Sequence, residues 1–96
     1  MKLEHLSFTQ EGDEKKLAVD TIATYTFDGS ILEFAQSERF TEVTEAISSY
    51  MAEHQIKGDG IIRIVPVQED RIMIDYGSHL NYFVIVPKSI DSLINI

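Results

Sequence analysis

Apolar and polar residues alternate between positions 16 and 27, and this alternation predicts a long, half-buried β-strand. On a strict period of two, one face of the strand carries Leu17, Val19, Ala23, Tyr25 and Phe27, with Thr21 as the only interruption. Asp28-Gly29 follows the strand, and this dipeptide suits the positive φ angles of a type I′ turn. Residues 31–36 are therefore predicted to return as the second arm of a β-hairpin.

Residues 38–54 follow the helical period instead and predict one long amphipathic α-helix. At about 100° per residue, its apolar side chains form one stripe. The members of this stripe are Phe40, Val43, Ile47, Tyr50 and Met51. Acidic residues fall on the opposite side, so the helix should pack on a sheet and present an acidic face outward. The two glycines in residues 57–60 are expected to end it.

Four more strands are predicted, over residues 1–8, 61–67, 71–76 and 79–86. Pro66 cannot donate to a β-ladder, so residues 61–67 should form an edge strand or end there. Residues 79–86 are apolar on both faces, which favours a central position in the sheet or a place in an interface. Pro87 should stop this strand, and Ser89 could cap a short C-terminal helix.

These elements predict a single α+β domain over residues 1–96, in the order βββ-α-βββ. Its mostly antiparallel sheet has about six strands, and the long helix packs on one face. The other face would then need cover for four apolar side chains, namely Ile61, Val65, Phe83 and Ile85. This requirement favours a homodimer, which could form through the apolar strand 79–86.

Charge and composition narrow the range of partners. The chain has 16 acidic and 8 basic residues, a formal net charge of −8 and no cysteine. Such a negative field repels phosphate backbones and anionic lipids, so direct binding to nucleic acid or membranes is not expected. The lack of cysteine excludes disulfides and thiolate chemistry. With no signal-peptide pattern and no long apolar run, the expected location is the cytoplasm of a cell or of an infected host.

Sequence motifs for catalysis and metal binding are missing. His5, His54 and His79 do not have the spacing that places two imidazoles on one metal. Gly58 and Gly60 follow a helix, whereas a phosphate cradle precedes one. No serine lies in a nucleophile motif. The chain is therefore predicted to be no enzyme and to bind no metal or cofactor.

The distribution of charge points to a protein partner. From Asp28 to Glu53 there are six acidic residues and one base, Arg39. We expect a protein-interaction module whose acidic helix face binds a basic or nucleic-acid-binding protein, as an inhibitor or immunity-type protein does. The residues predicted to form this partner-binding face are Glu38, Glu42, Glu45 and Glu53.

Two alternatives remain open from the sequence. One is a small-molecule-binding domain with a pocket between helix and sheet, lined by Tyr50, His54, Tyr76 and Tyr82. The other is a homodimeric structural domain. His54 itself has two interpretations, as a ligand or base under the sheet or as a side chain that bonds the last helix carbonyls.

Overall fold

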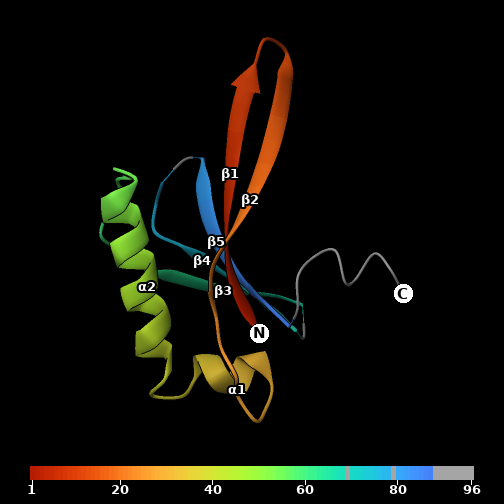
Figure 1. Ribbon diagram of the computed structural model, residues 1–96, viewed down its shortest axis with the longest axis vertical. Coiled ribbons are helices and arrows are strands. Elements are labelled where there is room, and N and C mark those ends of the chain that lie inside the picture. The colour runs from red at the N-terminus through yellow and green to blue at the C-terminus, as the bar shows by residue number, and fades with distance from the viewer. Residues whose placement is uncertain (69, 79, 88–96) are drawn as a thin grey trace.

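The computed structural model describes residues 1–68, 70–78 and 80–87. Within them the chain forms two strands, two helices and three further strands (Figure 1). Their bounds are β1 (Lys2–Glu11), β2 (Glu14–Thr24), α1 (Ile31–Ala35), α2 (Phe40–Glu53), β3 (Arg63–Gln68), β4 (Arg71–Asp75) and β5 (Asn81–Val86). The strands form one antiparallel sheet in the order β2-β1-β5-β4-β3, which confirms the α+β class. The short helix predicted after Ser89 lies outside the described residues.

The N-terminal half differs from its prediction, because β2 pairs with β1 and not with residues 31–36. The β1–β2 pairing runs from Lys2 opposite Thr24 to Glu11 opposite Glu14. Gly12, in the two-residue loop, has a φ of 63°, the left-handed region that such hairpin loops use. The order over the described chain is thus ββ-αα-βββ, and the predicted six strands and single helix are wrong in this half.

Residues 31–35 form the short helix α1 because the sequence before them caps a helix. The Ser30 hydroxyl accepts a hydrogen bond from the Glu33 backbone N–H at 3.1 Å, and the Glu33 carboxylate accepts one from the Ser30 backbone N–H at 3.3 Å. This reciprocal pair is a capping box, which satisfies two backbone donors at the helix start. Ile31 and Phe34, three residues apart, are the buried side chains of α1.

A β-bulge interrupts β2 at Ile22. Leu3 lies opposite Ala23, whereas the next β1 residue, Glu4, lies opposite Thr21, so Ile22 is one residue more than β1 provides. An extra residue of this kind reverses the sense of the alternation, because successive strand side chains point to opposite faces.

The bulge explains why the predicted apolar face of residues 16–27 is wrong. Leu17 and Val19 face away from the helices and are 54% and 40% exposed. Ala23 and Tyr25, beyond the bulge, pack in the core on the helix side. The interruption at Thr21 is the point in the sequence where the alternation changes face.

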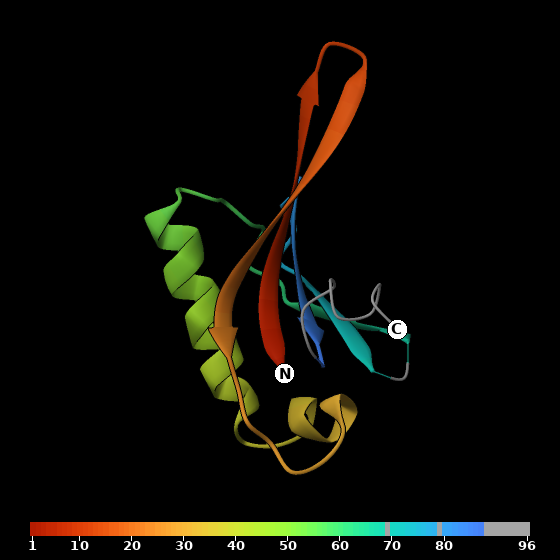
Figure 2. The same cartoon turned by 45° about the vertical axis from the view of Figure 1, so that its right-hand side comes forward.

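One apolar layer between the helices and one sheet face forms the core (Figure 2). The stripe predicted on α2 is confirmed, since its buried residues are Val43, Ile47 and Met51. The sheet residues buried against the helices come from β1, β4 and β5, and are Leu3, Ile72, Ile74, Phe83 and Ile85. The helix packed on one face of the sheet is therefore as predicted.

The C-terminal strands follow the prediction in order and position. β3, which contains Pro66, is an edge strand, and β5 is the central strand. The expected lack of cover is wrong for Phe83 and Ile85, which are 0% exposed under the helices. Ile61 and Val65 do lack cover as expected, and they are 56% and 42% exposed. Because β5 has β1 and β4 as neighbours, it offers no free edge for a homodimer.

The end of α2 at Glu53 agrees with the predicted end near residue 54, but residues 54–56 form it and not the glycines at 57–60. The Ile56 N–H donates to the Met51 carbonyl at 2.8 Å, and the Gln55 N–H donates to the Ala52 carbonyl at 3.4 Å. This pair of bonds is the Schellman arrangement, in which the residue after the C-cap adopts a left-handed conformation. That residue is Gln55, with a φ of 56°.

Replacing Gln55 by glycine should stabilise the fold. A left-handed φ strains any residue with a Cβ atom, whereas glycine adopts it freely. We expect Gln55→Gly to raise the free energy of unfolding by about 0.5–1 kcal/mol in urea denaturation.

The matched control is Gln36→Gly at the end of α1. Gln36 is a C-cap residue with a φ of −92°, where glycine relieves no strain. This variant should leave the unfolding free energy unchanged or lower it. A lower unfolding free energy for Gln55→Gly would contradict the assigned cause.

Candidate functional site

The acidic residues predicted to bind a partner lie on the outer side of α2. Glu42, Glu45 and Glu53 are exposed helix residues, and Glu38 is exposed in the turn before the helix. The opposite side of α2 is buried in the core. A helix rises about 1.5 Å per residue, so the carboxylates from Glu42 to Glu53 span about 16 Å along one rigid element.

Arg39 compensates part of this negative charge. Its Nε donates to Glu42 Oε2 at 2.7 Å, and its Nη1 donates to the Thr26 carbonyl at 2.5 Å. The hydrogen bond to Glu42 is the main reason that the pKa of Arg39 lies above its ordinary value. Within the described part of the chain, ion pairs reach none of the other three carboxylates, those of Glu38, Glu45 and Glu53.

The four residues predicted to line a pocket lie in three different places. Tyr50 and His54 stack on each other along α2, with ring centroids 3.9 Å apart. Tyr76 is buried in the core, where desolvation raises the pKa of its hydroxyl and the Ser48 hydroxyl offsets part of that rise. Tyr82 pairs opposite Leu6 and points to the sheet face away from the helices.

The position of His54 agrees with the second interpretation, in which its side chain bonds a carbonyl at the end of the helix. It is the C-cap of α2, and its Nδ1 lies 2.9 Å from the carbonyl oxygen of Tyr50, one turn back. The ring nitrogen donates to this carbonyl, which also accepts the His54 backbone N–H at 3.0 Å. His54 is also exposed, so it is not placed as a ligand or base under the sheet.

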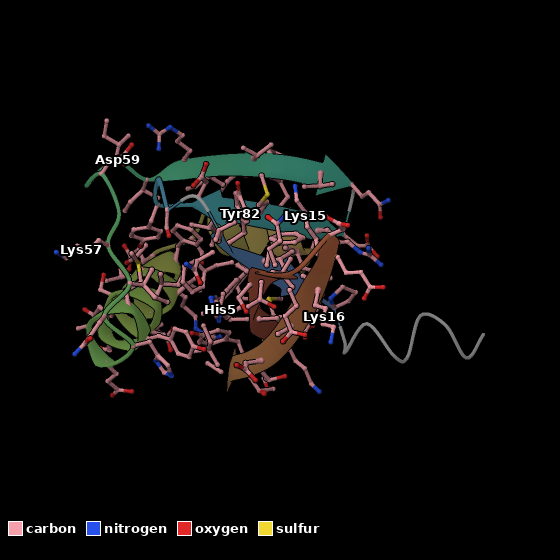
Figure 3. The ribbon with its side chains drawn as sticks, turned by 90° about the horizontal axis from the view of Figure 1, so that it is seen from above. His5, Lys15, Lys16, Lys57, Asp59 and Tyr82 are labelled. Carbon is pink, nitrogen blue, oxygen red and sulfur yellow. The ribbon has the colours of Figure 1, made fainter. Side chains whose placement is uncertain are left out.

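A hydrogen-bonded chain through His5 joins the sheet to α2, and sequence reasoning did not find it. His5 is 6% exposed and lies between the sheet and the helix (Figure 3). Its Nε2 lies 2.8 Å from Asn81 Oδ1, and its Nδ1 lies 2.9 Å from the Tyr50 hydroxyl. A neutral imidazole with its proton on Nε2 satisfies both contacts, since it donates to Asn81 and accepts from Tyr50.

The residues next to this hydrogen-bonded chain decide which chemistry it can support. The Asn81 amide donates to Ser78 Oγ at 3.0 Å, so an asparagine separates the serine from the His5 imidazole. A histidine that activates a serine must contact it directly. At the other end, the Tyr50 hydroxyl lies 3.4 Å from Asp20 Oδ2. Burial and this carboxylate raise the pKa of Tyr50, which keeps its hydroxyl protonated as a donor. This hydrogen-bonded chain therefore holds α2 against the sheet.

Tyr50→Phe should destabilise the fold, because it leaves a buried ring nitrogen of His5 without its donor. We expect the free energy of unfolding to fall by about 1–2 kcal/mol in urea denaturation. The control is Tyr25→Phe, because the Tyr25 hydroxyl makes a long contact of 3.5 Å with the Glu42 carbonyl. Equal losses in the two variants would show that the His5 contact has no special weight.

Asp59 organises the loop between α2 and β3. Its carboxylate accepts from Arg63 Nη2 at 2.8 Å and from the Ile61 N–H at 3.0 Å, and its own N–H donates to the Tyr76 carbonyl at 2.9 Å. The Arg63 hydrogen bond is the main cause that holds the pKa of Asp59 below its ordinary value, and the Ile61 bond adds to it. Gly58 packs so closely that a Cβ there would collide with the Tyr76 carbonyl oxygen.

The lowered pKa of Asp59 predicts a pH-dependent contribution to stability. The charged carboxylate favours the folded state above the unfolded pKa of about 4, and this contribution disappears as the pH falls through the folded pKa. Asp59→Asn should therefore lower the free energy of unfolding at pH 7, and the difference from the wild type should be smaller at about pH 2.5.

Urea denaturation at both pH values measures this difference. Asp13→Asn is the charge-matched control, since Asp13 is exposed in the hairpin loop and makes no hydrogen bond among the described residues. A deficit of Asp59→Asn that is the same at both pH values would contradict the role of the carboxylate charge.

A cavity lies on the sheet face away from the helices. Its volume is about 380 Å³. Its lining is mostly apolar, with one ammonium group, and consists of Phe8, Thr9, Gln10, Lys15, Leu80 and Tyr82. Figure 3 shows Lys15 and Tyr82 on this side of the sheet, apart from His5. This cavity thus lies away from the place where the sequence predicted a pocket.

Residues 1–68, 70–78 and 80–87 contain neither a cluster of metal ligands nor a membrane-spanning helix. No three His, Asp or Glu side chains gather there to hold a metal ion. No helix there has the length and apolar character needed to cross a membrane. Comparison with known proteins found no matching family model, no similar curated protein and no similar solved structure.

Proposed function

We propose that this chain is a protein-interaction module that binds a basic partner through the outer face of α2. The observation that carries this proposal is the set of three exposed carboxylates, on Glu38, Glu45 and Glu53, that lack an ion pair among the described residues. Their negative charge is available to a partner, whereas that of Glu42 is partly compensated by Arg39.

The packing of α2 supports the proposal because it holds the carboxylates in a fixed arrangement. Val43 and Ile47 are 0% exposed in the core, and the His5–Tyr50 hydrogen bond ties the helix to β1. A preorganised array loses less conformational entropy on binding than a flexible acidic segment does. The net charge of −8 would also attract a basic partner over a distance and speed its association.

The chemistry of the proposed partner follows from this array. A basic protein surface, such as the groove of a nucleic-acid-binding enzyme, is complementary to carboxylates spaced along a helix. Occupation of that groove would block the nucleic acid, so an inhibitor or immunity-type role is the form of the proposal that we favour. An enzymatic role has less support, because the His5 chain contains no directly activated nucleophile.

Removal of the three free carboxylates should abolish partner binding at low salt. The test variant is Glu38→Gln/Glu45→Gln/Glu53→Gln, used as immobilised bait in native lysate at about 50 mM and about 500 mM salt. We expect proteins captured by the wild type to be lost from the variant at low salt. They should also be lost from the wild type at high salt, since exposed charges are then screened.

The control variant carries the same charge change on other surfaces of the molecule. Asp13→Asn/Glu14→Gln/Asp70→Asn alters three exposed residues away from α2, and both triple variants change the formal net charge from −8 to −5. Retained capture by the control assigns binding to α2. Equal loss from both variants would show an effect of net charge alone, and undiminished capture by the α2 variant would exclude this face.

The second candidate function is binding of a small apolar ligand in the cavity beside Lys15. The cavity of about 380 Å³ favours it, because the volume suits a small molecule and the ammonium could bind a carboxylate on it. A thermal-shift screen of fatty and aromatic acids tests this candidate. Ligands that raise the melting temperature of the wild type but not of Leu80→Glu would support it.

A further inference from the structure

The two edges of the sheet differ in how they are protected against pairing. β3, at one edge, contains Pro66, which lacks a donor, and its register shifts between Pro66 and Gln68. Both features block the addition of another strand. β2, at the other edge, has neither proline nor glycine, and its residues from Glu14 to Thr21 are all exposed. The outer edge of β2 is therefore an open template for a further strand.

The accessible part of β2 lies in a hairpin that projects from the body of the molecule. Among the described residues, the β1–β5 pairing runs from Lys2 to Ser7 and is followed by one bond from the Phe8 N–H to the Leu80 carbonyl. The β1–β2 ribbon continues beyond the rest of the sheet (Figures 1 and 2). Between the hairpin loop and the bulge at Ile22, the regular stretch of β2 includes Lys15 to Thr21. The central residue of these seven is Ala18.

We propose that a second copy of this chain pairs antiparallel with this edge, on a two-fold axis that passes beside Ala18. In that register Lys16 lies opposite Asp20 of the second copy, and Leu17 lies opposite its Val19. The symmetry repeats both pairs, so the dimer has two ion pairs on the helix side of the sheet and two apolar pairs on the other side. Each pair joins directly opposite residues, the strongest cross-strand contact.

The present contacts of these side chains leave them free to exchange partners. Lys16 Nζ lies 3.0 Å from Glu11 Oε2 in an ion pair whose side chains are 59% and 71% exposed, and such pairs contribute little. Among the described residues, the contact of the Asp20 carboxylate is a long one, 3.4 Å from the Tyr50 hydroxyl, whose proton is directed to His5. Leu17 and Val19 are 54% and 40% exposed, so pairing removes apolar surface from water.

The charge pattern selects this register over its neighbours. A shift that centres the pairing on Leu17 places Glu14 opposite Asp20 of the other copy, and like charges then repel. A shift that centres it on Val19 places Asp20 opposite Ala18 and Lys16 opposite the bulged Ile22. Of the three registers, the Ala18-centred one alone brings opposite charges together, and it also fits the regular stretch between loop and bulge.

Dimerisation of this kind would continue the five-stranded sheet into ten strands. Because the two-fold axis runs through the sheet, the α2 helices of both copies lie on the same side. The dimer would then present two acidic faces to one partner or to two neighbouring partners, which raises the effective affinity without any new contact. The pairing itself does not rest on the function proposed for α2.

Charge exchange tests the proposal. By analytical ultracentrifugation over a concentration series, the wild type should be a reversible dimer. Lys16→Asp and Asp20→Lys should each raise the dimer dissociation constant by about tenfold or more, because each places like charges opposite one another twice. An equimolar mixture of the two variants should form a mixed dimer as tight as the wild type, since every pair is then complementary again.

The control for charge is Lys57→Asp, an exposed residue after α2, which should leave dimerisation unchanged. Circular dichroism of each variant tests whether it is folded. A wild type that stays monomeric at all concentrations overturns the proposal. So does a mixture of the two variants that fails to associate, even if the wild type is a dimer by another surface.

A cross-link tests the position of the axis. The chain has no cysteine, so Ala18→Cys introduces a single thiol at the proposed two-fold. Opposite residues of an antiparallel pair have Cα atoms about 4.5–5.5 Å apart, within the range of a disulfide. Mild oxidation should link Ala18→Cys as a dimer and leave Ala52→Cys, exposed on α2, monomeric. Equal cross-linking at both positions would overturn the assigned axis.

These experiments separate the dimer from the proposed function of α2. Lys16→Asp leaves Glu38, Glu45 and Glu53 in place, so each monomer would still bind a basic partner. Loss of the dimer with retained binding supports both proposals independently, and loss of binding in the α2 variant has no bearing on the cross-link.

Discussion

Side chains of α2 meet the central strands of the sheet in a single apolar layer, and the other features of the molecule are arranged around it. Val43 and Ile47 of the helix, Ile74 of β4 and Phe83 of β5 are all 0% exposed there. A chain of 96 residues can build about one such layer. One sheet face is therefore covered by helices, while the other keeps exposed apolar side chains such as Leu17.

Local periodicity predicted the structure correctly for segments whose own apolar pattern decides which side chains are buried. The stripe on α2 and the apolar strand β5 both gave the right element and the right burial. Residues 28–35 carried two competing local signals, a turn at Asp28-Gly29 and a helix cap from Ser30 to Glu33. No local pattern decides between them, because β2 takes its hairpin partner from β1, which precedes it in the chain.

Part of the candidate site likewise follows from local periodicity, and part depends on contacts between distant residues. The exposed position of Glu45 and Glu53 follows from helical periodicity, because the buried stripe lies on the opposite side. The contact of His5 with Tyr50 joins residues 45 positions apart, and that with Asn81 joins residues 76 apart. Only the folded sheet brings them together. One sequence signal could have indicated a buried polar contact. Position 5 carries a polar histidine on the same strand face as the apolar Leu3.

The bulge at Ile22 divides a single strand into two parts with different tolerance to substitution. On the loop side of the bulge, Leu17 and Val19 face away from the core, so changes there should be neutral for folding and open to selection by an external partner. On the other side of the bulge, Ala23 and Tyr25 pack against the core, where changes in volume are costly. The hairpin could therefore diverge rapidly between related proteins while the fold that carries it stays constant.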